Sequence, residues 1–345
     1  MENKKIKDIY TNLNVENIDA LLYQIEIIAP TSIQSIVDEM GRTEDIRFSP
    51  NQKKLAIAGF GQNSCIVLDI HIDRSGPKPV LHILDYIKIS SDSINHPHGF
   101  EFVDNDYLIV ANRVGYITVF DLKNIQTFDN QVHLKPIREV KYTGLFQDIN
   151  SPGSVCILTQ DDKEVDILVC NNYNHKISRH LIPLTNRWKF VKNSIFLQKG
   201  FNVPDGIAIN KEKTWLAISN HFTHSVLLFD LLSKMTPNTE SAGELVDAGY
   251  PHGLRFSADS KQIYVADAGS PFVNLYQSIS GDWSGNHTPN KKIRVLGQET
   301  FIRGHTNPEE GGIKGIDLSA EGDLLAVTNT EMPLSIIYLP DLGLS

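Results

Sequence analysis

The stretch HPHGFEF (96–102) decides the fold, because its pattern returns along the chain. It combines a turn that contains Pro and Gly with a strand of alternating apolar residues. The other copies read RTEDIRF (42–48), SPGSVCI (151–157), VPDGIAI (203–209), YPHGLRF (250–256) and GIKGIDL (312–318). Self-similarity at a fixed period indicates a repeat architecture, in which each copy belongs to one supersecondary unit.

The copies recur at a nearly constant interval. Their first strand residues are Ile46, Phe100, Val155, Ile207, Leu254 and Ile316, so the successive intervals are 54, 55, 52, 47 and 62 residues. Each unit continues with a second and a third apolar run, and the first five units end with a fourth, for example HILDYIKI (82–89), PIREVKY (136–142) and KKIRVLG (291–297). Four strands per unit at this period predict an all-β fold, a six-bladed β-propeller.

The two ends of the chain complement each other. The sixth unit stops before a fourth strand, whereas LLYQIEII (21–28) precedes the first unit without a repeat of its own. An N-terminal strand that completes the last blade would remove an exposed sheet edge. We therefore predict one domain over 1–345, with an N-terminal arm (1–16), a closing strand and link (17–42) and six blades (43–345).

Composition and charge restrict the partners. The chain has 32 basic and 41 acidic residues, a net charge of −9 and no basic run, so a nucleic acid is a poor partner. No apolar run approaches the roughly 18 residues of a membrane span, and the polar N-terminus lacks the apolar stretch of a secretory signal. Cys65, Cys156 and Cys170 have no CxxC spacing, which favours a reducing compartment. We expect a cytoplasmic protein that binds a small molecule and does not bind a membrane.

One position of the repeat collects polar side chains. The residue before the Gly position forms a column that should face the channel axis at one mouth, and it reads Glu44, His98, Gly153, Asp205, His252 and Lys314. Glu44 and Asp205 fall in opposite blades, and so do the two histidines. Two acids and two imidazoles without a basic counter-residue would repel or stay unsatisfied unless a cation or protons bridge them. The plain alternative is that these residues only face channel water.

The convergence predicts a divalent metal site. Carboxylates alone suit calcium or magnesium, whereas two histidines shift the preference toward zinc, manganese or iron. The expected ligands are Glu44, Asp205, His252 and His98, with Asp45 and Asn220 as secondary candidates. Asn220, like Asn112, is also explained as a residue that caps the turn after its strand.

Several stretches resemble a known family. TEDIRFSPN (43–51), NHPHGF (95–100) and FNVPDGIAIN (201–210) resemble the serum paraoxonase group of calcium-dependent lactonases and arylesterases. VPDGIAI and YPHGLRFSADSKQIYVAD (250–267) are more distantly similar to gluconolactonases, regucalcin and NHL-type propellers. The resemblance implies a six-bladed propeller that binds calcium in its channel and hydrolyses lactones or esters.

The resemblance also implies roles for single residues. Glu44, with Asp45 beside it, matches a metal-binding Glu of the family, and Asp205 matches a metal-binding Asn. His98 matches a His that lies over the metal and transfers protons. The chain departs from the family at Gly153, where a ligand Asn is missing.

Two further departures concern His252 and Arg113. His252 stands where the family has a metal-ligand Asp, and Arg113 aligns with the second His of its proposed dyad. His98, His252 and Arg113 are thus the catalytic candidates, beside an incompletely matched calcium sphere.

The resulting hypothesis is a metal-dependent lactonase or esterase. The cation would polarise the ester carbonyl while His98 takes a proton from water. No GxSxG elbow supports a serine nucleophile. Lys314 is interpreted as a solvated lysine of the mouth, as a clamp for a substrate carboxylate, or as an amine that would occupy the metal place electrostatically. Arg303 and His305, in the long stretch 297–312, are candidates for substrate selection or are simply solvated.

Two other functions stay open from the sequence. A propeller can be a non-catalytic interaction platform that binds a protein at the same mouth, because a fold does not dictate a chemistry. It can also be a strictosidine-synthase-like enzyme that condenses or cyclises metabolites without metal. Metal content separates these alternatives from the hydrolase.

Overall fold

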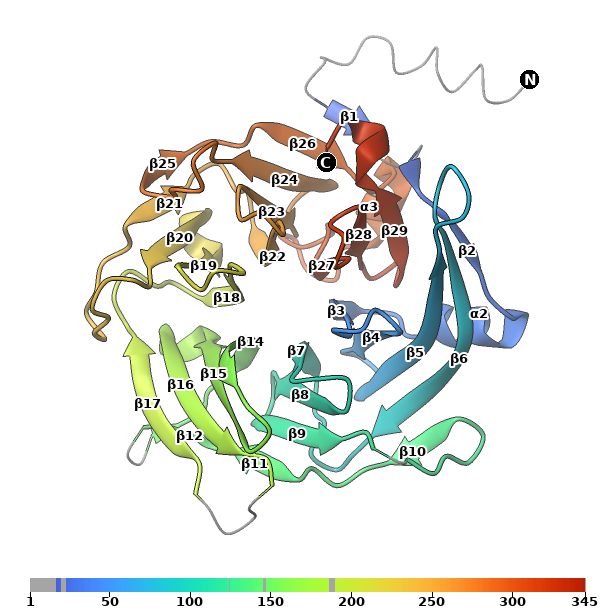
Figure 1. Ribbon diagram of the computed structural model, residues 1–345, viewed down its shortest axis with the longest axis horizontal. Coiled ribbons are helices and arrows are strands. Elements are labelled where there is room, and N and C mark those ends of the chain that lie inside the picture. Colours follow the sequence, from blue (N-terminus) through green and yellow to red (C-terminus); the bar gives the residue numbers. More distant parts are fainter. Residues whose placement is uncertain (1–16, 20–22, 124, 145–146, 186–189, 345) are drawn as a thin grey trace.

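The computed structural model describes residues 17–19, 23–123, 125–144, 147–185 and 190–344. Six sheets are arranged as blades around a central axis (Figure 1), and the predicted six-bladed β-propeller is confirmed. The predicted arm over 1–16 lies outside the described residues.

The innermost strand of each blade begins within the repeated stretch. These strands are β3 (Thr43–Phe48), β7 (Pro97–Phe102), β14 (Pro152–Gln160), β18 (Pro204–Ile209), β22 (Pro251–Phe256) and β27 (Ile316–Leu318). The register of the first five shifts just after the strand begins, as between Pro204 and Ile207. Such a bulge re-aims a side chain. The bulge spans the column residue, which explains why that residue turns toward the axis.

The remaining strands add outward by antiparallel pairing. The second strands are β4 (Lys54–Gly59), β8 (Tyr107–Asn112), β15 (Glu164–Asn171), β19 (Trp215–Asn220), β23 (Gln262–Asp267) and β28 (Leu324–Val327). The third are β5 (Ser64–Asp73), β9 (Ile117–Asp121), β16 (Lys176–Pro183), β20 (Ser225–Asp230), β24 (Phe272–Gln277) and β29 (Ser335–Tyr338). The fourth are β6 (Val80–Ser90), β11 (Arg138–Val140), β17 (Lys192–Leu197), β21 (Gly243–Leu245) and β26 (Lys291–Arg294).

Short elements decorate this ring. β10 (Gln131–His133) and β25 (Gly285–His287) pair in parallel with β6 and β21, and β12 (Tyr142–Gly144) pairs with β13 (Gln147–Asp148). The helical segments are α2 (Thr31–Asp38), α3 (Gln298–Arg303), η2 (Asn172–Asn174), η3 (His221–Thr223) and η4 (Leu339–Leu342). Within the described part of the chain, no helix combines the length and the apolar character needed to cross a bilayer.

The N-terminal segment contacts three blades, including the last one. β1 (Asn17–Asp19) pairs in parallel with β26, and β2 (Glu26–Ile28) pairs in parallel with β6. Between them, Gln24 forms a single bridge to Ile337 of β29. The segment predicted to be a full strand of the last blade thus gives that blade one bridge within its described residues. Closure by an N-terminal strand is thus present, and most of the described pairing of the segment is with β26 and β6.

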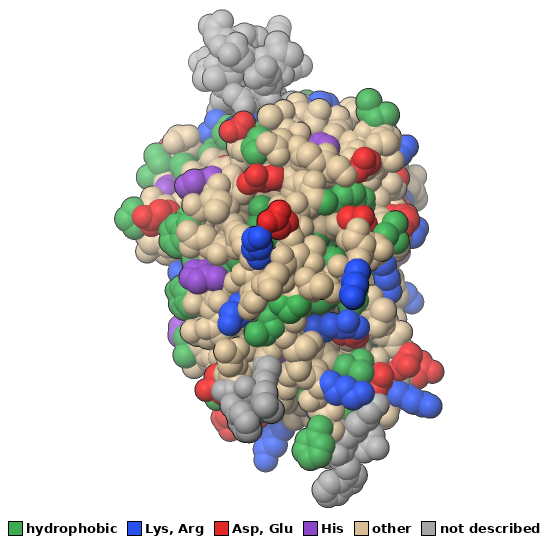
Figure 2. Space-filling view, turned by 90° about the vertical axis from the view of Figure 1, so that its left-hand side faces the viewer, with side chains coloured by type: hydrophobic (Ala, Val, Ile, Leu, Met, Phe, Trp, Pro, Cys, Tyr) green, Lys and Arg blue, Asp and Glu red, His purple; other side chains and the backbone are tan. Residues whose placement is uncertain are grey.

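The hydrophobic core lies between the blades. Six clusters of buried side chains each combine residues of two neighbouring blades. Ile46, Leu68 and Leu324, for example, belong to the cluster between the first and sixth blades. Each blade therefore depends on its neighbours to bury its apolar faces. Figure 2 shows one side of the disc, where acidic, basic and hydrophobic side chains are interspersed.

Candidate functional site

Four of the predicted residues meet at one end of the channel. Glu44 Oε2 lies 3.5 Å from Nε2 of His98 and 3.5 Å from Nε2 of His252. Asp205 Oδ2 lies 3.1 Å from Nδ1 of His252, and Asp205 Oδ1 lies 3.8 Å from Nε2 of His98. All four side chains are buried. We call these four residues, together with His221, the central cluster.

His221 was not predicted from the sequence. It follows β19 as the first residue of η3, and its Nε2 lies 3.5 Å from Oδ2 of Asp205. Its ring stacks on Tyr250 with centroids 4.5 Å apart. The stretch WLAISNH (215–221) could have indicated this residue, because this second strand of its blade ends at the same mouth as the column residues.

Gly153 explains why the third blade contributes no side chain. A Cβ at this position would collide with the side chains of Asn172 and Asp205, so the Asn of the resembled family has no room. The carbonyl of Gly153 instead accepts a hydrogen bond from Nδ1 of His98 at 3.0 Å. Because a carbonyl only accepts, Nδ1 carries the proton. Nε2 of a neutral His98 therefore has a free lone pair.

Basic residues do accompany the acids, and the expectation that the cluster has none is wrong. Lys314 Nζ lies 3.3 and 3.2 Å from the two carboxylate oxygens of Glu44 and also contacts Glu310. Arg42 donates through Nε to Glu44. Lys314 is 1% exposed, so its interpretation as a solvated lysine is wrong as well. The repeat did not reveal this network because Glu310 lies in the long connection before the sixth blade.

Asp205 is held through one of its oxygens. Asn172 donates to Oδ1 at 2.8 Å, and Nη1 of Arg113 lies 3.4 Å from the same oxygen. Oδ2 is buried and accepts no hydrogen bond. Arg113 is thus placed beside the cluster, with its side chain 18% exposed.

Burial and the nearby cations set the charges. Burial opposes ionisation of Glu44, but the ammonium of Lys314, together with the electrostatic effects of His98, Arg42 and His252, outweighs burial and holds the pKa of that carboxyl well below its usual range. Burial lowers the pKa of His98 to about 3 and that of His252 to about 4. Near neutral pH, Glu44 is therefore ionised and both imidazoles are neutral.

The donor atoms form two overlapping groups that could hold a metal ion. One contains Glu44, His98 and His252, and the other contains Asp205, His221 and His252. Buried atoms without a hydrogen-bond partner are Glu44 Oε2, His98 Nε2, Asp205 Oδ2 and both ring nitrogens of His221. Buried polar atoms of this kind are costly unless a cation or proton meets them. The cluster therefore fits a divalent metal, and its imidazoles favour zinc, manganese or iron over calcium.

Asp45 and Asn220 are excluded from the cluster by their own hydrogen bonds. Asp45 accepts from the backbone N–H groups of Ile46 (2.9 Å) and Phe100 (3.1 Å). Asn220 accepts from the N–H of Asn202 at 2.6 Å and donates to Gly200 at 3.1 Å. Both secondary ligand candidates thus hold the backbone in place, and Asn220 fixes the turn before β18 instead of the turn after its own strand.

Arg303 and His305 lie apart from the cluster. Arg303 ends α3 and pairs with Glu331 at 3.3 Å, with its side chain 62% exposed. Nδ1 of His305 is 2.9 Å from the carbonyl of Phe301. Glu310 is the residue of this stretch whose side chain reaches the central cluster, through Lys314.

Aromatic and apolar side chains surround the cluster end. The connections after β8, β15 and β19 place Val114, Tyr173 and Phe222 there, each more than half exposed. Arg113 lies over the ring of Tyr173, 5.9 Å from its centroid. Arg42 lies over the ring of another aromatic residue, Phe60, at 4.3 Å. Cationic and apolar groups thus alternate around this mouth.

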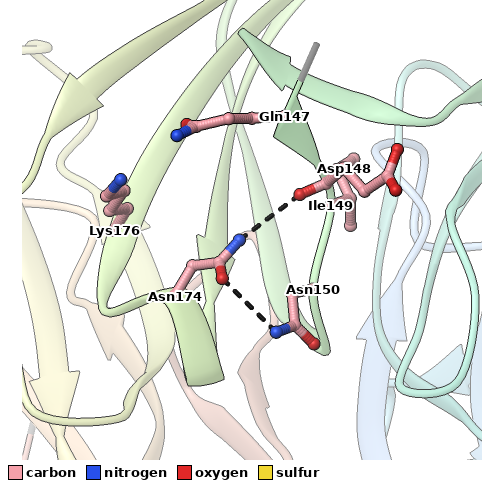
Figure 3. A pocket seen from close by; sticks show the side chains of 6 residues that line it. All are labelled: Gln147, Asp148, Ile149, Asn150, Asn174 and Lys176. Carbon is pink, nitrogen blue, oxygen red and sulfur yellow. Dashed lines mark hydrogen bonds between the residues drawn. The ribbon is translucent and has the colours of Figure 1, made fainter.

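A polar depression of about 490 Å³ lies farther out on the third blade. Figure 3 shows Asn174 donating to the carbonyl of Asp148 and Asn150 donating to Asn174, both at 3.3 Å. Its amide groups are largely satisfied by one another.

Comparisons with known proteins add information about the fold. No model of a protein family matches the chain, and no curated protein is significantly similar to it in sequence. A solved protein provisionally assigned as a gluconolactonase is similar with a TM-score of 0.54 and 14% identity, over 87% of this chain and 90% of that one. A chain of a mitotic checkpoint complex has a TM-score of 0.50 and 12% identity, over 87% and 78%. The likeness is one of fold.

A provisionally assigned 6-phosphogluconolactonase from Bacteroides fragilis is also similar, with a TM-score of 0.48 and 15% identity, over 83% of this chain and 76% of that one. One protein named as a gluconolactonase is therefore among the structural neighbours that share this fold. The narrower resemblance to paraoxonases stays a prediction.

Proposed function

We propose that the chain is a metal-dependent hydrolase that acts on a lactone or an ester at the cluster end of the channel. The observation that carries the proposal is the free lone pair on Nε2 of His98. This atom is buried, has no hydrogen-bond partner and faces Glu44 and Asp205. A positioned base next to donors for a divalent cation is the arrangement that ester hydrolysis by water requires.

The acids of the central cluster, together with His221 and His252, are the residues that would hold the metal, while His98 stays free as the base. A bound divalent ion would supply a Lewis acid that polarises the carbonyl of the substrate. The protein supplies the other elements. Gly153 fixes the tautomer and the orientation of His98 through its carbonyl. His98 then takes a proton on Nε2 from the attacking water, and the nearby carboxylates stabilise the imidazolium that forms.

The surroundings of the mouth fit a substrate with polar and apolar parts. Arg113 and Arg42 remain partly exposed, so guanidinium N–H groups are available to carbonyl or carboxylate oxygens. Tyr173 and Phe222 offer apolar surface at the same end. The structural likeness to a propeller named as a gluconolactonase supports sugar lactones as one class to test.

Acid release from a panel of substrates tests the proposal. The purified protein is expected to hydrolyse at least one of gluconolactone, an alkyl δ-lactone and phenyl acetate. His98→Gln should lower kcat/KM by about 10² to 10⁴, the usual contribution of a general base. His133→Gln is the matched control, because His133 lies in β10 with its side chain 54% exposed. No turnover by the natural protein, or equal rates for the His98 variant, would disprove the proposal.

A protein-binding platform is the second candidate function. It is favoured by the exposed side chains of Val114, Tyr173 and Phe222 around one mouth. It does not require the cluster, so replacement of His98 by Gln would leave binding unchanged. Replacement of Tyr173 and Phe222 by Ser would weaken it.

A further inference from the structure

We propose that the central cluster has two places for a cation, that Lys314 fills the place beside Glu44, and that one divalent transition metal binds Asp205, His221 and His252. This inference rests on the metal dependence in the proposed function. It goes beyond it by choosing between the two donor groups and by assigning His221 as a ligand.

The spacing of the Asp205 group fits a tetrahedral ion. Two ligand atoms that are each about 2.1 Å from a zinc ion lie about 3.4 Å from one another. Asp205 Oδ2 is 3.1 Å from Nδ1 of His252 and 3.5 Å from Nε2 of His221. Two imidazoles and one carboxylate form a common set of protein ligands for zinc and for non-haem iron.

The hydrogen bonds of Asp205 leave the correct atom free. Asn172 and Arg113 approach Oδ1, at 2.8 and 3.4 Å. Oδ2 accepts no hydrogen bond, although it is fully buried, and neither ring nitrogen of His221 has a hydrogen-bond partner. One oxygen is thus fixed by the protein while the other faces two imidazoles. This division is typical of a carboxylate that binds a metal through one oxygen and is oriented through the other.

His252 connects the two places. Its Nδ1 faces Asp205, and its Nε2 lies 3.5 Å from Oε2 of Glu44. A histidine that binds a metal through one nitrogen usually directs its other N–H toward a carboxylate, which fixes the tautomer. Glu44 is in the right place for that function. It is therefore a positioning residue in this proposal and not a ligand.

Lys314 removes the need for a cation at Glu44. Its ammonium lies 3.2 Å from the same Oε2 that would bind a metal in the first group, and it is 1% exposed. Arg42 donates to the other oxygen of Glu44. A second divalent ion at this place would be a few ångströms from a buried ammonium, and the repulsion is strong where water is excluded. His98 is consequently left free of metal, as its function as a base requires.

Cobalt binding distinguishes the two groups. Protein freed of metal with a chelator is titrated with Co²⁺, and binding is followed by isothermal titration calorimetry and by the visible d–d absorption of the ion. The natural protein should bind one equivalent. His221→Phe keeps an aromatic ring against Tyr250 but removes the ligand, and we expect at least about a hundredfold loss of affinity. His98→Phe removes an imidazole that is equally buried, and we expect a change below about tenfold.

Each outcome has one meaning. If the natural protein binds no Co²⁺, the metal dependence in the proposed function fails and the inference fails with it. If it binds one equivalent and His98→Phe is the more damaging variant, or if both variants lose binding equally, only the inference is overturned. Two equivalents in the natural protein would also overturn it, because Lys314 would then not exclude the second ion. Circular dichroism of each variant confirms that the blades have formed.

Discussion

Lys314 and Glu44 form a buried ion pair on which the charge balance of the central cluster depends. Lys314 also contacts Glu310, so a single ammonium lies between two carboxylates that are close together, and Arg42 contacts both as well. A buried charge that loses its partner is far more costly than a surface pair, because water cannot replace the lost cation. The function of Lys314 in the folded state is therefore to permit two acids at the axis.

Replacement of Lys314 by Met should destabilise the protein by about 3 to 5 kcal/mol, since it leaves Glu44 and Glu310 without their shared cation. Urea unfolding followed by tryptophan fluorescence measures this change. Lys54→Met is the control, because Lys54 and Asp69 form a pair at 2.6 Å that is partly exposed on both sides. The control should cost less than about 1 kcal/mol. Equal losses in the two variants would contradict this account.

At the residue scale, the sequence predicted the position of the acids and imidazoles but not their partners. The repeat placed Glu44, His98, Asp205 and His252 in one column, and the structure brings them together. The repeat period locates residues on the strands, so it could not reveal residues that reach the axis from the connections between strands. Glu310 and His221 lie in such connections, and only the folded chain places them beside the column.

At the scale of single elements, strand β16 carries a buried histidine far from the cluster. His180 is 2.8 Å from Asn193 of β17 and 2.7 Å from Ser178, and burial lowers its pKa to about 4. In the unfolded chain the pKa of histidine is about 6.5, so between these values only the unfolded state binds the proton. The contribution of His180 to stability is present above pH 6.5 and is lost as the pH falls toward 4.

His180→Gln should therefore weaken the acid sensitivity of the fold. Between pH 7 and pH 4, the natural protein should lose about 2 to 3 kcal/mol more stability than the variant, as expected from a shift of this size. Urea unfolding at a series of pH values gives the two slopes. Identical slopes in the pH window would show that His180 is not the group responsible.

Strand positions could be predicted from the sequence because alternation and turn residues fix them locally. The bulges in the innermost strands, such as the shift between Thr43 and Ile46, could not, since a bulge depends on the register with the neighbouring strand. Asp45 shows the consequence. Its carboxylate was a candidate ligand, yet on the bulged strand it accepts backbone hydrogen bonds instead.

At the scale of the whole molecule, stability depends on contacts between blades. Ile25 shows how the N-terminal segment takes part, because its N–H donates to the carbonyl of Ile336 at 3.0 Å and its side chain is 6% exposed. It packs in the cluster between the first and sixth blades. The sequence predicted that this segment closes the ring, but its pairing with β6 could not be predicted, because the partner of a short strand depends on which sheet edges the folded ring leaves free.

Ile25→Ala should lower the free energy of unfolding of the entire ring by about 2 to 4 kcal/mol, since it creates a cavity where the ring closes. Calorimetry should show one transition that moves to lower temperature. Ile28→Ala is the matched control, because Ile28 is 44% exposed in β2, and its effect should be small. A separate early transition in the Ile25 variant would mean that the blades unfold independently.

The pairing of this N-terminal segment also has a consequence during translation. Asn17–Asp19 pairs with β26 and Gln24 bridges β29, two strands that the ribosome makes much later than this segment. Glu26–Ile28 can join β6 early, whereas its neighbours must wait for partners more than 250 residues away. The nascent chain therefore remains an open arc until those strands have been synthesised, and closure is expected to be a late step of folding.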